Sequence, residues 1–241
     1  MDLLWQGFAE AFWLLVQRDT DLMQISARTL GISLLATLLA TLIGLPTGVA
    51  LATSRMPGRR VLTTLVNTGM GIPPVVVGLA VSIFLWRTGP FGPLQLIYTP
   101  AAMVLAQFLV AVPIATAFTR AAVEAISSEQ VDAFRVAGAT GPTLGRELIR
   151  AAFPGVVLAI TAAFGRAIAE VGASLMVGGN LAGQTRVLTT TITLETSRGE
   201  FARAIALGII LLALAFLVNV VFSWASRRGH TSESGGRRGV N

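Results

Sequence analysis

Two opposite charges stand within a long apolar segment of this chain. Arg166 and Glu170 are four residues apart, so a helix places them one turn apart on the same face. A charge at membrane depth costs about 2.5–3.5 kcal/mol on insertion scales and normally faces a protein interior or an aqueous cavity. Two interpretations remain open. The pair is an ion pair that makes insertion tolerable, or Arg166 faces a water-filled pathway in which Glu170 keeps solute binding weak enough for release.

Other chemistry is sparse in the sequence. There is no cysteine, all 18 basic residues are arginine, and the single histidine, His230, lies in a tail rich in Gly, Ser and Arg. A P-loop needs a lysine, and serine or zinc hydrolases need a histidine base or ligand, so neither is expected. We therefore expect no catalytic site, no metal and no cofactor. The net charge of +6 does not predict nucleic-acid binding, because in a multispanning protein it reflects orientation.

Composition and segment length predict a membrane protein. Hydrophobic residues make up 54% of the 241 residues, charged residues only 12%, and the mean hydropathy is +0.73. An all-α polytopic fold follows, with an N-terminal interfacial helix in residues 1–26, a membrane domain in 27–226 and a disordered cytoplasmic tail in 227–241. The expected spans are the apolar segments of about 20 residues or more, at 29–53, 61–86, 99–119, 154–178 and 204–225.

The arginines predict the orientation of these spans. One set of alternate loops, with the tail, carries eleven arginines and the opposite set six. The positive-inside rule then places the C-terminus and the long loop 120–153 in the cytoplasm and the N-terminus outside.

The loop 120–153 reads as two short helices joined by a turn. Ser127 can cap a helix over 128–137, with Gln130 at the third helical position. Gly138 suits the left-handed position after that helix, and Pro142 suits the first turn of a second helix that runs to Ala152. The first helix cannot bury its apolar residues within the hairpin, which predicts a partner surface.

The same loop carries a family resemblance. Asp132-Ala133-Phe134, then Gly138, and later Phe153-Pro154 resemble the EAA loop by which ABC-importer permeases dock a separate ATPase. Asp132 stands where the family usually has glutamate. The gap of 16 residues from Gly138 to Pro154 is longer than the general pattern and resembles the tungstate-type permeases. Similar runs occur at 71–78, 89–92 and 177–180, so the resemblance covers about residues 27–222.

The resemblance implies a type I ABC-importer transmembrane domain with five transmembrane helices, in the bacterial inner membrane. The chain would form a homodimer in the lipid bilayer, dock two cytoplasmic ATPase subunits and receive tungstate from an extracytoplasmic binding protein. Docking would fall on Asp132, Ala133, Phe134, Gly138, Ala139 and Thr140. Molybdate or sulfate are alternative cargoes, and a secondary carrier, a channel or a membrane enzyme are alternative functions.

Further pathway or gate candidates lie in or beside the spans. Pro73 and Pro74, like Pro113, break backbone hydrogen bonds inside a span and act either as hinges or as fixed kinks. The resemblance adds Gln107, Asn180 and Arg186. It also implies that the segment from Gly178 to Arg203 forms a short helix near the external mouth, with Gly178, Gly179 and Gly183 as turn residues. Arg186, Arg198 and Arg203 would form a basic rim that concentrates anions or would simply anchor the chain at the interface.

Overall fold

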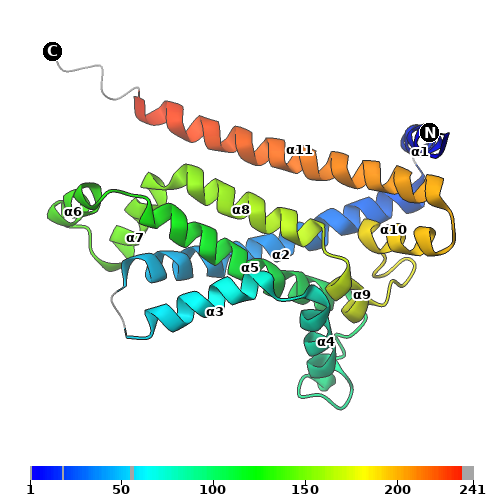
Figure 1. The fold of residues 1–241 in the computed structure, drawn as a ribbon, viewed down its shortest axis with the longest axis horizontal. Coiled ribbons are helices and arrows are strands. Elements are labelled where there is room, and N and C mark those ends of the chain that lie inside the picture. Colours follow the sequence, from blue (N-terminus) through cyan, green and yellow to red (C-terminus); the bar gives the residue numbers. More distant parts are fainter. Residues whose placement is uncertain (1, 18, 55–56, 235–241) are drawn as a thin grey trace. The chain divides into compact units, whose positions relative to one another are not determined.

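The computed structural model describes residues 2–17, 19–54 and 57–234. Within them the chain forms eleven α-helices and one 3₁₀ helix, without a β-strand (Figure 1). The helices are α1 (Asp2–Val16), α2 (Thr20–Thr53), α3 (Arg59–Gly71), α4 (Pro74–Leu85), η1 (Gly92–Leu94), α5 (Pro100–Glu124), α6 (Ser128–Val136), α7 (Gly141–Ala151), α8 (Phe153–Ile168), α9 (Gly172–Gly178), α10 (Leu188–Ser197) and α11 (Phe201–Ser234).

Three helices are long and apolar enough to cross a membrane: α2, α5 and the Phe201–Trp224 part of α11. Two bent pairs raise the possible spans to five, because α3 with α4 and α7 with α8 each pass the same test as one broken span. The bends are 101° and 83°. The fold is therefore the all-helical one predicted from sequence.

Proline chemistry explains the first bend. Pro73 has an extended backbone, with φ −58° and ψ 123°, and Pro74 opens α4. A proline disfavours the helical conformation of the residue before it, and its missing N–H is harmless in the first turn of a new helix. The segment 61–86 therefore falls on two helices separated at Ile72 and Pro73.

The chain divides into two compact units. The first contains residues 1–38, 72–111 and 164–216, and the second contains residues 39–71, 112–163 and 217–241. A cluster in the first unit packs α2, α4, α5 and α9 together around the fully buried Met103 and Val177. In the second unit Val49, Val123, Leu148, Ala152 and Val156 form a core from α2, α5, α7 and α8.

Small residues let helices approach closely within the second unit. A Cβ added at Gly44 would lie 2.6 Å from the Cβ of Ala115, and one at Gly48 would lie 2.7 Å from the carbonyl oxygen of Thr116. The glycines stand four residues apart on α2 and face α5, which is the small-xxx-small arrangement of membrane helices.

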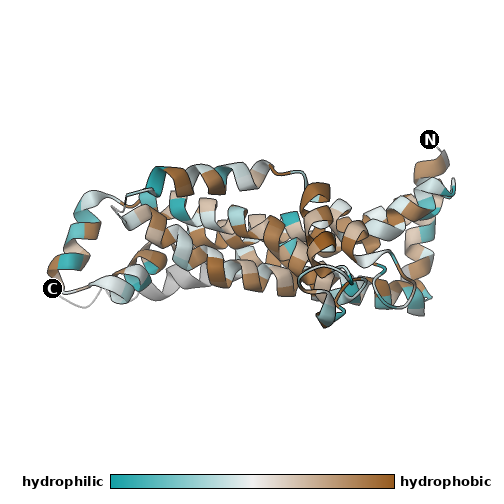
Figure 2. Cartoon of the chain, turned by 90° about the horizontal axis from the view of Figure 1, so that it is seen from below, coloured by the Kyte–Doolittle hydropathy of each residue, from teal (hydrophilic) through white to brown (hydrophobic). Residues whose placement is uncertain are grey.

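The outer surfaces of the long helices are apolar. Leu42, Leu212 and Phe216 are 62%, 71% and 70% exposed, and hydrophobic colour runs along most helices in Figure 2. Such extended apolar surface is suited to lipid.

The C-terminal helix is longer than sequence reasoning expects. α11 continues to Ser234, into the segment 227–241 that was expected to be disordered, and residues 235–241 lie outside the described residues.

Candidate functional site

The hairpin of α6 and α7 has the turn that its sequence predicts. The Ser127 hydroxyl accepts a hydrogen bond from the Gln130 N–H at 3.4 Å at the start of α6. At the other end Gly138 adopts φ +89°, its N–H donates to the Arg135 carbonyl, and the Ala139 N–H donates to the Phe134 carbonyl. These two bonds form a Schellman motif, which requires the left-handed residue at Gly138.

The second helix of the hairpin starts immediately afterwards. The Thr140 N–H donates to the Thr143 hydroxyl at 2.9 Å, and Pro142 lies in the first turn of α7. Only Gly138 and Ala139 therefore separate the capping residues of α6 and α7, and the direction of both helices is fixed by local bonds.

The hairpin surface has a hollow at this turn. A cavity of about 400 Å³ is lined by Phe134, Ala137, Gly138, Ala139, Thr143 and Glu147. Three of the predicted docking residues line it: Phe134, Gly138 and Ala139. Asp132, Ala133 and Thr140 are exposed nearby in sequence, and Asp132 pairs with Arg135 at 3.0 Å.

An anchor to the rest of the second unit lies at the base of the hairpin. Leu148 of α7 is completely buried in the core of this unit, and Val131 and Phe134 of α6 pack half-buried against it. Val136, by contrast, is 89% exposed. The hairpin is held firmly on one side and presents apolar surface on the other.

The charge at the start of α6 is also fixed locally. The Glu129 carboxylate accepts hydrogen bonds from its own backbone N–H and from the Ser127 hydroxyl, and both lower its pKa. Glu129 thus remains ionised at neutral pH, beside the positive end of α6.

The charged pair of the fourth predicted span lies at a helix break. The segment 154–178 is divided between α8 and α9, and Glu170 stands between them with 2% of its side chain exposed. Its Oε1 accepts the Ala173 N–H at 2.9 Å, while its Oε2 lies 3.9 Å from Arg166 Nη2. The Thr189 hydroxyl donates to the Glu170 carbonyl at 3.0 Å.

Glu170 therefore has a structural role that the sequence did not reveal. It caps the first turn of α9 and satisfies a backbone N–H that would otherwise be buried without a partner. Arg166 is a looser partner, and one third of its side chain stays accessible.

Gln107 is an interhelical hydrogen-bonding residue in the first unit. It is 3% exposed, accepts from the Ser33 hydroxyl at 3.1 Å and donates to the Ser174 hydroxyl at 3.2 Å. The side chain links α2, α5 and α9. Because all three groups are buried, this arrangement fits a fixed contact between helices.

Asn180 and Arg186 lie in the segment that joins α9 to α10. Asn180 adopts φ +52° and accepts a hydrogen bond from the Thr190 hydroxyl at 2.9 Å. Arg186 is half-buried, with a buried Nε that has no partner among the described residues. The expected short helix is α10, with Gly179 and Gly183 at positive φ as turn residues; Gly178 is the last residue of α9.

Residues 44–229 match the family described as binding-protein-dependent transport system inner membrane component. The chain belongs to this family. Its members are ABC-importer permeases, multi-pass proteins of the inner membrane that work with an ATPase and a binding protein.

Relatives of this permease cover most of its length. It is 42% identical to a probable anion ABC transporter permease protein of Haloferax volcanii, over 84% of the chain and 89% of the relative. It is 36% identical to the tungstate uptake system permease protein TupB of Peptoclostridium acidaminophilum, over 92% and 97%. It is 32% identical to the molybdenum transport system permease protein ModB of Mycobacterium tuberculosis, over 86% and 80%.

A solved structure shares the fold. The permease superposes on a chain of the inward-facing MetNI methionine ABC transporter with a TM-score of 0.71 at 23% identity, over 90% of this chain and 96% of the other. At this identity the likeness concerns the architecture of a type I ABC-importer transmembrane domain.

Some contacts of the permease were missed because its sequence carries no local signal for them. In the sequence, Arg28 is only one of the arginines that predict the orientation of the spans. In the structure its guanidinium donates to the carbonyls of Arg186 and Gly183 at 2.9 and 2.8 Å. The bonds span more than 150 residues, so no spacing rule could find them.

Proposed function

We propose that the chain is the membrane subunit of an ATP-driven tungstate importer, working as a homodimer surrounded by lipid. Two observations support the cargo. The relative named for tungstate uptake aligns over 97% of its own length at 36% identity, and the relative named for molybdenum transport is less similar at 32%. The anion permease at 42% identity supports the broader class of an oxyanion.

The hairpin supports the energy-coupling part of the proposal. Its exposed side offers the apolar Val136 and the 400 Å³ hollow around Gly138, while its other side is anchored in the core through Leu148. A surface of this kind can receive an ATPase subunit and pass its movement to α2, α5 and α8. The single observation that carries the docking site is the Schellman turn at Gly138.

The topology completes the proposal. We propose five spans, formed by α2, α3 with α4, α5, α8 with α9, and α11, with the hairpin and the C-terminus in the cytoplasm, the N-terminus outside and α1 at the interface. In this topology α7 belongs to the cytoplasmic hairpin, and the fourth span is the predicted segment 154–178. The excess of arginine in the alternate loops supports this orientation.

The pathway would run at the dimer interface. Arg166 remains the best candidate for a transient partner of the anion, since its side chain is one third exposed and only loosely paired. Pro73, Pro74, Asn180 and Arg186 are candidates for the walls or gate. Gln107 contributes by holding three helices together.

Uptake measurement tests the cargo. Cells that express this permease with its ATPase and binding protein should accumulate tungsten, and excess molybdate or sulfate should compete weakly. Equal competition by molybdate favours a molybdate permease, the second candidate. Uptake that persists without the ATPase subunit would favour a carrier or channel.

A further inference from the structure

An arginine-lined cavity lies in the second unit, away from the residues assigned to docking or to the pathway. Its volume is about 790 Å³. The end of α2, the start of α3 and the last turns of α5 contribute its walls. The lining residues are Ser54, Gly58, Arg59, Arg60, Val61, Thr63, Thr64 and Arg120. Within the described ranges, the lining contains three guanidiniums and three hydroxyls and no carboxylate.

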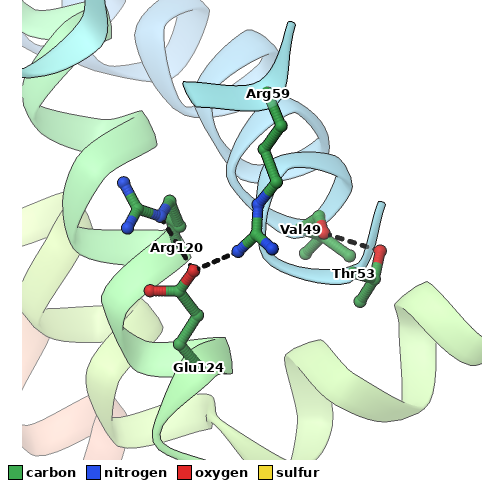
Figure 3. A network of polar contacts seen from close by, with 5 residues as sticks. All are labelled: Val49, Thr53, Arg59, Arg120 and Glu124. Atoms are coloured by element: carbon green, nitrogen blue, oxygen red, sulfur yellow. Dashed lines mark hydrogen bonds and ion pairs between the residues drawn. The ribbon is translucent and has the colours of Figure 1, made fainter. Parts of the chain in front are cut away.

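One carboxylate fixes two of these arginines from the side. Glu124 Oε1 lies 2.5 Å from Arg59 Nη2 and 2.9 Å from Arg120 Nε, as Figure 3 shows. The side chains of Arg59, Arg120 and Glu124 are 36%, 24% and 33% exposed. The shared carboxylate balances one of the two positive charges and holds both guanidiniums in place, so less rotamer freedom is lost when a ligand binds.

Arg60 adds a second uncompensated charge. It is exposed and makes no ion pair within the part of the chain that the structure describes. The four groups Arg59, Arg60, Arg120 and Glu124 therefore sum to a charge of +2. Guanidinium forks bind the oxygens of tetrahedral anions in a bidentate manner, and the hydroxyl of Thr63 in the lining adds a donor of matching type. The Thr64 hydroxyl already donates to the Arg60 carbonyl at 2.9 Å.

We propose that this cavity binds a tetrahedral oxyanion on the face of the protein that carries the hairpin. Two sources share this chemistry: a free oxyanion, which under the proposed function includes the imported one, and the phosphate of an anionic lipid headgroup. The cytoplasmic location of the cavity and the identity of the free anion rest on the proposed function. The existence of the site is argued only from the residues that line the cavity and from Glu124.

The position of the site gives it a means to influence the hairpin. Glu124 ends α5, and α6 begins at Ser128 only four residues later. A second cavity of about 290 Å³ joins Arg59 and Glu124 to Val131 and Arg135 of α6. A bound oxyanion competes with Glu124 for Arg59 and Arg120, so occupancy changes the contacts at the base of the hairpin.

Binding measurements on the purified full-length chain test the site, with tungstate and inorganic phosphate as probes in titration calorimetry. Arg60→Gln should weaken binding about two- to fivefold, the scale of one partly exposed charge pair. Glu124→Gln should tighten binding by a similar factor, because it removes the competing negative charge while its amide oxygen can still accept from the guanidiniums. Arg146→Gln, which removes an exposed arginine of α7 outside the cavity, should leave binding unchanged. Added salt should weaken binding.

A second arm identifies the lipid source. Native mass spectrometry after reconstitution with phosphatidylglycerol counts retained anionic lipids, and the same opposite shifts for Arg60→Gln and Glu124→Gln would assign the site to a headgroup. The expected pattern is weaker binding in Arg60→Gln and stronger binding in Glu124→Gln. If neither free-anion binding nor lipid retention shows this pattern, the proposal is overturned. Anion binding without transport would refute the proposed function alone, and transport without binding would refute this site alone.

Discussion

The backbone N–H of Ala139 donates to the Phe134 carbonyl at 2.9 Å, and this bond closes the turn that separates α6 from α7. Gly138 makes it possible by adopting φ +89°, a conformation that costs a residue with a Cβ about 1–2 kcal/mol. The hollow proposed for ATPase docking is built directly on this turn.

Substitution of Gly138 by a β-branched residue should therefore uncouple docking from folding. We expect Gly138→Val to insert into the membrane normally but to lose most of the copurifying ATPase. Gly138→Asn should retain much of it, since asparagine tolerates the left-handed region. The matched control is Gly145→Val on α7, where an added Cβ meets only Val49 at an ordinary 3.6 Å. Equal ATPase recovery from all variants would contradict the docking assignment.

Glu170 and Arg166 should separate into different roles. Glu170→Gln keeps an oxygen acceptor for the Ala173 N–H and should fold nearly as well as the parent chain. Glu170→Leu leaves that buried N–H unpaired and should cost about 1–3 kcal/mol. Thermal unfolding in detergent measures both. If Glu170→Leu is as stable as Glu170→Gln, the capping role is wrong.

Arg166 should matter for transport more than for folding. We expect Arg166→Gln to reduce the maximal rate of tungsten uptake at unchanged expression, because the cation offered to the anion is lost. Arg87→Gln, which removes an exposed arginine between α4 and η1, serves as the charge-matched control. Unchanged uptake by Arg166→Gln would contradict a role of Arg166 in the pathway, and only its loose pairing with Glu170 would remain.

Gln107 should show coupling with its two partners. Gln107→Leu removes two buried hydrogen bonds, each worth about 0.6 kcal/mol on average between membrane helices. Ser33→Ala and Ser174→Ala should each lower the free energy of unfolding by less than Gln107→Leu does. When either is combined with Gln107→Leu, the further loss should not exceed about 0.5 kcal/mol. Thermal unfolding of the single and double variants gives the coupling energies, and full additivity would argue against the network.

Two glycines of α2 provide a paired test of helix packing. Gly48→Ala places a Cβ 2.7 Å from the Thr116 carbonyl oxygen and should destabilise the chain by about 1–3 kcal/mol through overpacking. Gly31→Ala meets nothing within 4 Å and should be neutral or stabilising by up to about 1 kcal/mol, because alanine favours the helix. The order of the two melting temperatures checks the prediction, and a reversed order would contradict the close contact between α2 and α5.

Local chemistry made the hairpin predictable from the sequence. Ser127, Gly138 and Pro142 act through bonds to residues within five positions, so the cap, the left-handed turn and the second helix start could be read directly. α6 ends at Val136, one residue before the expected end, because Ala137 takes the capping position. Hydropathy predicted the apolar helical segments, but the segments 61–86 and 154–178 each fall on two helices.

The remaining features depend on which helices meet, and the sequence does not state that. Glu170 was recognised as a charged partner of Arg166, but its bond to the Ala173 N–H exists only because the helix breaks between Ile168 and Gly172. Arg59 and Glu124 are 65 residues apart in sequence, so their pairing requires the tertiary fold.

The account depends most on a cytoplasmic hairpin that is covered by an ATPase subunit, and one labelling measurement addresses this directly. The chain has no cysteine, so Val136→Cys introduces a single reactive thiol on a side chain position that is 89% exposed. A membrane-impermeant maleimide should label it in inside-out vesicles, fail to label it in right-side-out vesicles, and label it much less once the ATPase is bound. Labelling from the outer side, or labelling that the bound ATPase does not reduce, would contradict the central claim.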